Sequence, residues 1–322
     1  MDGLSSLVRQ ANLLASLDVR CQLAGEFHLP HDDEAAGTVP FHLVLSGECQ
    51  VQTAAGIFPV RGGDFVLLPR GSAHAVHNGP GRFPVLPVSR RVDGWLPLRQ
   101  SGDGSLVEVD LLCGRFCFSS GIGDWLLSGL PEPWRISFSS LSAQAMLESL
   151  VGWIRQEAGQ SASGSVAIVT SLVQALLTLA LREQGNQPDT PPGLLKLLGH
   201  SRLAISVHAV LKAPEYPWTI AELGRLAAMS RATYARHFAE SAGMGVGAFL
   251  LRLRMLKACA LLRQTSQRAG EIGLAVGYQS EAAFGKAFRQ FSGLAPGRYR
   301  LFSVRISWEL HFSPIFHLIL LS

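Results

Sequence analysis

The sequence predicts an α+β chain of several domains, with a β-barrel at the N-terminus, helices in the middle and an all-α domain of two related units at the C-terminus. Three observations predict this architecture. The chain has 322 residues, about twice the usual length of one domain. Up to residue 138, short apolar runs alternate with turn residues, which is typical of a barrel or sandwich. Beyond residue 141, apolar residues recur at intervals of three and four, as on one face of a helix.

Composition predicts a folded protein in a reducing compartment. Hydrophobic residues make up 48% of the chain and charged residues 16%, which supplies material for cores and excludes a disordered chain. The five cysteines form no CxxC pair, so we expect reduced and mostly buried thiols. The N-terminus lacks a basic segment followed by a long apolar run, and no uninterrupted apolar stretch is long enough to span a membrane. We therefore expect a cytoplasmic protein with no membrane partner.

The first domain is assigned to residues 1–138, and its clearest predicted strands cover 41–45, 65–68 and 106–112. A helical region follows at 139–200, with apolar helices expected at 141–158 and 165–183. A segment rich in turn residues ends this region. The residues expected to share the apolar face of its first helix are Met146, Leu147, Leu150, Val151 and Ile154.

The charge of the chain is unevenly distributed. Residues 196–300 contain 15 Lys and Arg against 5 Asp and Glu, whereas residues 1–195 contain 12 against 18. A basic block of about one domain on an otherwise acidic chain favours a polyanion as the partner of that block.

The basic block contains an internal repeat, with copies at 223–238 and 272–288. In each copy a short helix precedes a tight turn, and a serine, Ser230 or Ser280, stands where its hydroxyl can cap the next helix. That next helix is expected to bury two aromatic residues and to leave its other face to solvent or to a groove. The residues expected to be buried are Leu223, Leu226, Ala227, Tyr234 and Phe238 in the first copy, and Ile272, Ala275, Val276, Phe284 and Phe288 in the second.

A helix of this kind can enter the major groove of DNA with its N-terminal residues at base edges. An apolar helix with basic residues, including Phe249, Leu253, Arg252 and Arg254, joins the two copies. Two copies joined by a stiff helix would reach successive major grooves, roughly 34 Å apart on one face of the duplex. The sequence therefore predicts two helix-turn-helix units.

These residues resemble the DNA-binding domain of AraC/XylS-type transcriptional regulators. The strongest match runs over 277–291 and continues with Gly293, Pro296, Tyr299 and Arg300. The resemblance covers residues 218–300, and we assign the domain to 201–301. It implies promoter DNA as a partner, with RNA polymerase as a further one.

The chain departs from this family pattern at three positions. Gly224 and Gly273 replace the usual alanine, at a cost of roughly 1 kcal/mol each inside a helix. Ala228 replaces the usual turn glycine, and a residue with a Cβ atom is less favourable at positive φ.

The resemblance assigns DNA contacts to the outward positions of the second helix in each unit. Arg236 is the leading candidate for base recognition, because arginine can bind guanine O6 and N7 together. Arg252, Arg254 and Arg289 are expected to bind phosphates. The remaining predicted contact residues are Ser230, Arg231, Ala232, Ala235, Ser280, Glu281, Ala282 and Lys286.

A second motif lies in the first domain, at Gly63, Pro69, Arg70, Gly71, His74 and Asn78. Its spacing matches the second conserved motif of the cupin barrels, and residues 41–47 and 112–116 also resemble the cupin-type domain found on many AraC-type regulators. The resemblance implies a cupin-like sensor for a small-molecule effector. A barrel mouth is a suitable place for such a pocket.

In metal-binding cupins the histidine of this motif, here His74, is a ligand. The partner set is incomplete in this chain, because Pro40 stands in place of a histidine beside His42 and Glu48 lies one or two places too far along. We therefore expect no metal and no cofactor, and we name His42 and His74 as candidate ligand-binding residues. His28, His31, Asp32 and His42 offer the side chains of a ligand cluster, but we interpret 29–34 as a polar loop.

The sequence thus predicts a homodimeric, effector-responsive transcription factor that is not an enzyme. Two alternatives are a metal-dependent cupin enzyme with an accessory helical domain and a nucleic-acid binder without sequence preference. The resemblance places the dimer interface in the helical region, where exposure of Leu176, Leu177 and Leu179 would support it. Residues 302–322 form an atypical apolar tail to which we assign no function.

Overall fold

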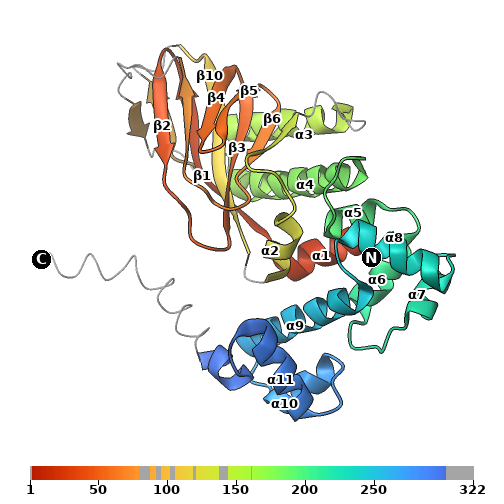
Figure 1. Cartoon of the computed structure of the whole chain (residues 1–322). Coiled ribbons are helices and arrows are strands. Elements are labelled where there is room, and N and C mark those ends of the chain that lie inside the picture. The colour runs from red at the N-terminus through yellow and green to blue at the C-terminus, as the bar shows by residue number, and fades with distance from the viewer. Residues whose placement is uncertain are drawn as a thin grey trace, which may run out of the picture. The chain divides into compact units, whose positions relative to one another are not determined.

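The computed structural model describes residues 2–79, 88–91, 96–101, 106–118, 121–137, 144–160 and 162–301, so the predicted tail lies outside the described residues. The chain divides into two compact units (Figure 1). One, the β unit, comprises 8–119 and 123–191. The other, the helical unit, comprises 1–7, 120–122 and the chain from 192 onward. The helical region that the sequence sets apart at 139–200 is therefore mostly part of the β unit.

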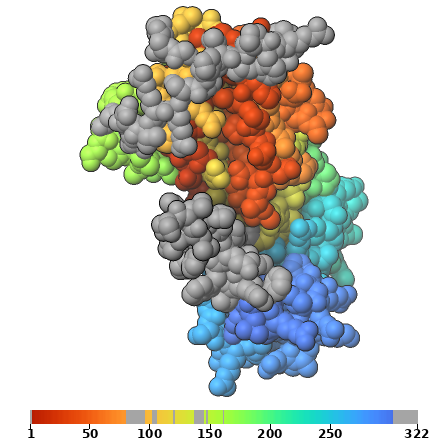
Figure 2. Space-filling view, turned by 90° about the vertical axis from the view of Figure 1, so that its left-hand side faces the viewer, coloured from red at the N-terminus to blue at the C-terminus, as the bar shows by residue number. Residues whose placement is uncertain are grey.

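The β unit contains two sheets. Its N-terminal residues, in red and orange, form a large part of the surface that Figure 2 shows. The seven-stranded sheet has the order β11-β6-β3-β10-β1-β9-β8 and is antiparallel except between β1 and β9. Its strands are β1 (Leu14–Leu23), β3 (Thr38–Ser46), β6 (Asp64–Leu67), β8 (Val88–Arg91), β9 (Leu98–Ser101), β10 (Val109–Cys117) and β11 (Trp134–Ser137).

The second sheet has four antiparallel strands in the order β2-β7-β4-β5. They are β2 (Phe27–His31), β4 (Glu48–Thr53), β5 (Gly56–Arg61) and β7 (His74–Asn78). Both sheets contribute side chains to one apolar core. Its members include Val19, Cys21, Leu23, Phe27, Val44, Val51, Val66, Val76, Leu111 and Cys113. Burial of these side chains joins the two sheets, at a gain of roughly 25 cal/mol for each Å² of apolar surface removed from water.

The predicted strands agree with the structure in two places and begin too early in a third. Residues 41–45 lie within β3, and 65–68 overlap β6 with a shift of one residue. The third prediction, 106–112, was wrong at its start, because Leu106 and Val107 are exposed and β10 begins at Val109. Leu106 and Val107 are apolar, but they precede the first residue of β10 that pairs with a neighbouring strand. Apolar character alone therefore does not define a strand.

Two long helices, α3 (Gln144–Gly159) and α4 (Ser165–Asn186), pack together, and α4 also lies on β1 (Figure 1). Val151 and Ile154 are buried in α3 as predicted, but Met146 is exposed. Among the described residues, α4 is the one helix whose length and composition would suit a membrane span, and core helices of soluble proteins pass the same test. The short helices α1 (Gly3–Ala11) and α2 (Gly121–Leu127) complete this part of the chain.

The expected exposure of the α4 leucines was wrong. Leu176 and Leu177 are completely or almost completely buried, and Leu179 is half-buried. These side chains face the core of the β unit because α4 packs against both α3 and β1. The exposed apolar residues of this helical pair are instead Met146, Trp153, Val166 and Ile168.

The helical unit follows the predicted sequence of a repeated helix pair. Its helices are α5 (Leu194–Gly199), α6 (Leu203–Lys212), α7 (Ile220–Leu226), α8 (Arg231–Ala242), α9 (Val246–Gln264), α10 (Ala269–Ala275) and α11 (Glu281–Ser292). α7 packs on α8 and α10 on α11, and the long α9 contacts α8, α10 and α11.

Two of the expected buried residues of these pairs were wrong. Leu226 is 41% exposed and Ala275 is also exposed, whereas Gly224 and Gly273 are buried. A Cβ atom on Gly273 would lie 3.0 Å from the Phe284 side chain. The short helix α10 therefore approaches α11 through Gly273. Glycine lowers the helix propensity of α10, but an alanine at this position would crowd the Phe284 side chain.

The equivalent turns of the two pairs give a matched test of backbone strain. Ala228 adopts φ 51° and Gly277 adopts φ 89°, both in the left-handed region that disfavours residues with a Cβ atom. We expect Ala228→Gly to stabilise the helical unit by about 0.5–1 kcal/mol. Gly277→Ala should destabilise it, because the new Cβ atom would also lie 2.5 Å from the carbonyl oxygen of Glu215. Thermal and urea unfolding of both variants would measure this, and equal shifts of one sign would contradict it.

Candidate functional site

The N-terminus of α8 is fixed by a side-chain cap. Ser230 Oγ accepts a hydrogen bond from the backbone N–H of Thr233 at 3.2 Å, which confirms the predicted cap. The buried face of the helix carries Tyr234 and Phe238, and the Tyr234 hydroxyl lies 3.0 Å from Ser206 Oγ. These contacts determine which side of α8 remains available for a partner.

The opposite side of α8 is open to solvent. Arg231, Ala232 and Arg236 are exposed and Ala235 is half-buried. The Arg236 side chain is 66% exposed, and its guanidinium lies 3.8 Å from a Glu240 carboxylate oxygen. An exposed ion pair of this kind contributes little to the stability of the fold. Arg236 can therefore leave Glu240 and bind another anion at a small cost in free energy.

α11 repeats this arrangement. Ser280 Oγ accepts from the backbone N–H of Ala283 at 3.3 Å, again as predicted. Phe284 and Phe288 are buried. The residues that point outward are Glu281, Ala282, Lys286 and Arg289, all exposed, together with the half-buried Gly285. Both second helices therefore present a mixed face of small and cationic residues.

Arg252 and Arg254 of α9 are only half-exposed. The Arg254 guanidinium donates hydrogen bonds to the carbonyl oxygens of Pro214 and Tyr216, at 2.7 and 2.9 Å, and to Glu215 at 3.4 Å. Arg254 thus holds the loop that leads into α7, which leaves fewer of its donors for a phosphate. The sequence could not predict this role of Arg254, because the loop that it binds is about 40 residues away along the chain.

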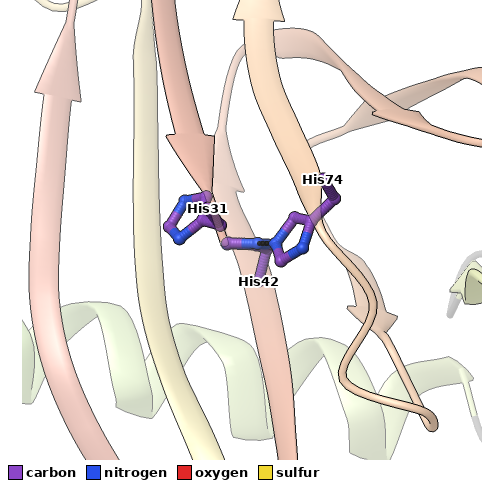
Figure 3. Close-up of side chains that lie close together, drawn as sticks. All are labelled: His31, His42 and His74. Atoms are coloured by element: carbon purple, nitrogen blue, oxygen red, sulfur yellow. Dashed lines mark hydrogen bonds between the residues drawn. The ribbon is translucent and has the colours of Figure 1, made fainter. Parts of the chain in front are cut away.

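Three histidines meet between the two sheets of the β unit (Figure 3). His31 ends β2 and is directly opposite His74 on β7, with the two rings stacked at 4.7 Å between centroids. His42 comes from β3 of the other sheet, and its Nε2 lies 2.8 Å from Nε2 of His74. One nitrogen from each ring lies within 4.8 Å of one from each of the others.

The hydrogen bonds around these rings define a consistent set of tautomers. His74 Nδ1 lies 2.9 Å from the carbonyl oxygen of Ser72 and must donate to it, so Nε2 of a neutral His74 is an acceptor. His42 Nε2 then donates to His74, and His42 Nδ1 accepts from the Cys113 thiol at 3.1 Å. The thiol is protonated, because its side-chain hydrogen bond with Cys21 and its burial raise the pKa of Cys113.

The loop that carries His74 is anchored by two carboxylates. Glu132 accepts hydrogen bonds from the backbone N–H groups of Arg70 and Ser72, at 2.7 and 3.2 Å. Asp33 accepts from the backbone N–H of Ala73 at 2.8 Å. The imidazole of His74 is therefore held in place by the main chain beside it.

The interpretation of 29–34 as a polar loop was wrong for its first half. His31 belongs to β2, and the strand pairing turns its ring toward His42 and His74. The alternative of a ligand cluster that includes His31 and His42 agrees with the structure for these two residues, whereas His28 and Asp32 are not part of the cluster. Glu48 is not part of the cluster.

Glu48 instead lines a separate pocket of about 460 Å³ beside β4 and β5. The pocket is polar, and its charged lining residues are Glu48, Arg61, Asp64 and Arg135. Arg135 donates to the carbonyl oxygen of Pro59 at 2.6 Å. Neither His42 nor His74 lines this pocket, so the two predicted ligand-binding residues and the open cavity are distinct places in the β unit.

Comparison with known proteins identifies the two parts of the chain. Residues 2–184 match the family model described as Cupin, and residues 223–301 match that of a helix-turn-helix domain. Together with the relatives described next, these matches show that the chain belongs to the AraC-type transcriptional regulators with an N-terminal cupin domain. The resemblance drawn from the sequence is thereby confirmed.

Three relatives match almost the whole chain. An uncharacterized HTH-type transcriptional regulator of Haemophilus influenzae is 32% identical, covering 93% of this chain and 98% of that protein. The HTH-type transcriptional regulator MtrA of Neisseria gonorrhoeae is 33% identical, with the same coverage of both chains. The RCS-specific HTH-type transcriptional activator RclR of Escherichia coli is 28% identical and covers 93% and 97%. None of these three names describes an enzyme.

The buried histidines predict how stability depends on pH. Burial, followed by the nearby His74, Arg99 and Arg115, lowers the pKa of His31 from 6.5 to about 4. Burial also lowers the pKa values of His42 and His74. Between pH 6.5 and 4 the unfolded chain therefore binds more protons than the folded chain, and stability falls as pH falls.

For His31 alone the expected loss across this window is about 3 kcal/mol in the free energy of unfolding. Urea unfolding in the presence of a chelator, at pH 7, 6, 5 and 4, would measure it. The variant His31→Gln lacks the titrating ring and should show a shallower dependence. An identical slope in the variant would contradict the assignment.

Proposed function

We propose that the chain regulates transcription as a dimer in the cytoplasm, with its helical unit reading promoter DNA and its β unit responding to an effector. The observation that carries this proposal is the pair of capped helices, α8 and α11, each with buried aromatic residues on one side and exposed cationic residues on the other. Helices of this kind present their N-terminal and outward residues to the major groove.

The proposed contact residues divide by role. Arg236 and Lys286 reach base edges, with Arg236 suited to guanine. Arg231, Arg252 and Arg289 contact phosphates and set the register on the duplex. The small residues Ala232, Ala235 and Ala282 allow close approach, and Glu281 near the start of α11 can accept from a cytosine amino group. Ser230 and Ser280 act by fixing the helix ends beside the DNA.

The proposed mechanism is a shift between states that differ in binding to DNA or to RNA polymerase, biased by an effector in the β unit. The polar pocket beside β4 and β5 is large enough for a small molecule. Its mixed charges favour an effector that is itself polar. We propose no catalytic role for this unit.

The proposed dimer contact uses the exposed apolar side chains of α3 and α4. Trp153 is 63% exposed, and Met146, Val166 and Ile168 are also exposed. Large apolar side chains gathered on one helical pair favour a protein partner, because a second copy would remove them from water. The proposed contact therefore uses side chains other than the leucines expected from the sequence.

Selection of binding sites from a pool of random duplexes with the full-length protein, followed by fluorescence anisotropy, tests the proposed DNA contacts. We expect Arg236→Ala to weaken binding to the selected site by about 1–3 kcal/mol and to relax preference at one base pair. Arg289→Ala should weaken binding to selected and scrambled duplexes alike and reduce the slope of log affinity against log salt by about 1.

Glu240→Ala serves as the control, because it removes the partner of Arg236 without removing the arginine. It should bind the selected site at least as tightly as the parent. Failure to enrich any sequence, with equal affinity for all duplexes, would overturn the specific regulator and support a non-specific nucleic-acid binder.

Substitution of the exposed tryptophan tests the dimer. We expect Trp153→Arg to convert the dimer into a monomer with little change in melting temperature, because the side chain is exposed within one chain. Light scattering coupled to size-exclusion chromatography would measure the mass. Val151→Ala, at a buried position of the same helix, should lower the melting temperature instead and leave the mass unchanged. A Trp153→Arg variant that remains dimeric would exclude this interface.

A further inference from the structure

The cluster of His31, His42 and His74 in the β unit contains one buried ring nitrogen that has no hydrogen-bond partner in the described part of the chain. The Nε2 atom of His31 is buried and has no hydrogen-bond partner among the described residues. A buried polar atom without a partner costs roughly 1–3 kcal/mol, so native proteins rarely keep one without a reason. This nitrogen lies in the same small space as the ring nitrogens of His42 and His74 (Figure 3).

We propose that His31, His42 and His74 form a binding site for one late first-row divalent transition-metal ion, with Zn²⁺ as the reference. Neutral imidazole nitrogens are the preferred ligands of such ions, and three of them with one open position form a common type of site. This inference does not depend on DNA binding, and it replaces the incomplete ligand set seen in the sequence. His31, which lies outside the cupin motif, supplies the third ligand.

The hydrogen bonds of the cluster suit this occupant. His74 donates through Nδ1 to the carbonyl oxygen of Ser72, which turns the lone pair of Nε2 into the cluster. A backbone carbonyl behind a ligating histidine is a frequent outer contact in metal sites. When the ion binds, the proton of His42 moves from Nε2 to Nδ1, which lies 3.1 Å from Cys113 Sγ, and Nε2 becomes free to ligate.

The spacing requires only a small rearrangement. Two nitrogens about 2.0–2.1 Å from one tetrahedral ion are separated by roughly 3.3 Å. His42 Nε2 and His74 Nε2 are 2.8 Å apart as a hydrogen-bonded pair, and all three ligand nitrogens lie within 4.8 Å of one another. The pair must therefore open slightly and His31 must approach. Asp33 and Glu132 hold the loop of His74, so the adjustment falls on the other rings.

The first arm of the test measures metal binding by the full-length protein. After removal of metal with a chelator, Zn²⁺ titrated in should bind at one ion per chain and raise the melting temperature, because it binds the folded state. Co²⁺ in its place should give visible d–d absorption without an intense sulfur charge-transfer band, since all three ligands are nitrogens. Binding below one ion per chain, or a thiolate spectrum, would overturn the proposal.

The second arm uses variants that separate ligation from folding. We expect His31→Ala to lower the affinity for Zn²⁺ by at least about tenfold. Loss of a residue that only hydrogen-bonds a metal ligand already has an effect of this size, and loss of a ligand should have one at least as large. His28→Ala removes an imidazole from the same strand at a position that faces the other way, and it should bind as the parent does. His42→Gln, a second ligand variant, guards against a His31→Ala protein that fails to fold. Parent-like affinity in folded His31→Ala would exclude His31 as a ligand.

Discussion

The helical unit depends on one helix that is buried along two sides. α9 packs Phe249 against Phe238 of α8, with ring centroids 5.3 Å apart in an edge-to-face arrangement. Further along, Met255, Ala258, Cys259 and Leu262 join the aromatic residues of α11 in a second core. Both exposed cationic faces are therefore held on a common support. The proposed binding of α8 and α11 in successive grooves of DNA would require such a common support, because the duplex is stiff.

Glycines and one arginine make this packing tight. Gly277 lets its turn come so close to residue 215 that a Cβ atom would lie 2.5 Å from that residue's carbonyl oxygen. Arg254 holds the same segment through three carbonyl oxygens. The turn of the second helix pair, the loop before the first pair and the joining helix thus meet at one point. Arginine suits this point because its planar guanidinium offers five donors, whereas lysine could not reach three carbonyls in this fixed geometry.

The β unit solves a different problem, which is how to keep polar rings in an apolar interior. Its core contains aliphatic side chains and the buried thiols of Cys21, Cys49 and Cys113. Burial of His42 favours its neutral form, and the chain of contacts from Cys113 through His42 and His74 to the main chain satisfies most of the polar atoms. Both ring nitrogens of His77 and Nε2 of His31 have no hydrogen-bond partner among the described residues, and of these three atoms only His31 Nε2 lies in the cluster with His42 and His74.

The sequence by itself determined the order of the parts, the serine caps and the buried aromatic residues of α8 and α11, because these follow from spacing over a few residues. The outward arginines followed as the other face of the same helices. The sequence could not determine that Leu226 is exposed while Gly224 is buried, because this depends on the angle at which α7 packs on α8. The grouping of His31 with His42 and His74 was decided by the tertiary structure alone. The three residues lie on strands of two different sheets, and only the packing of one sheet on the other brings their rings together.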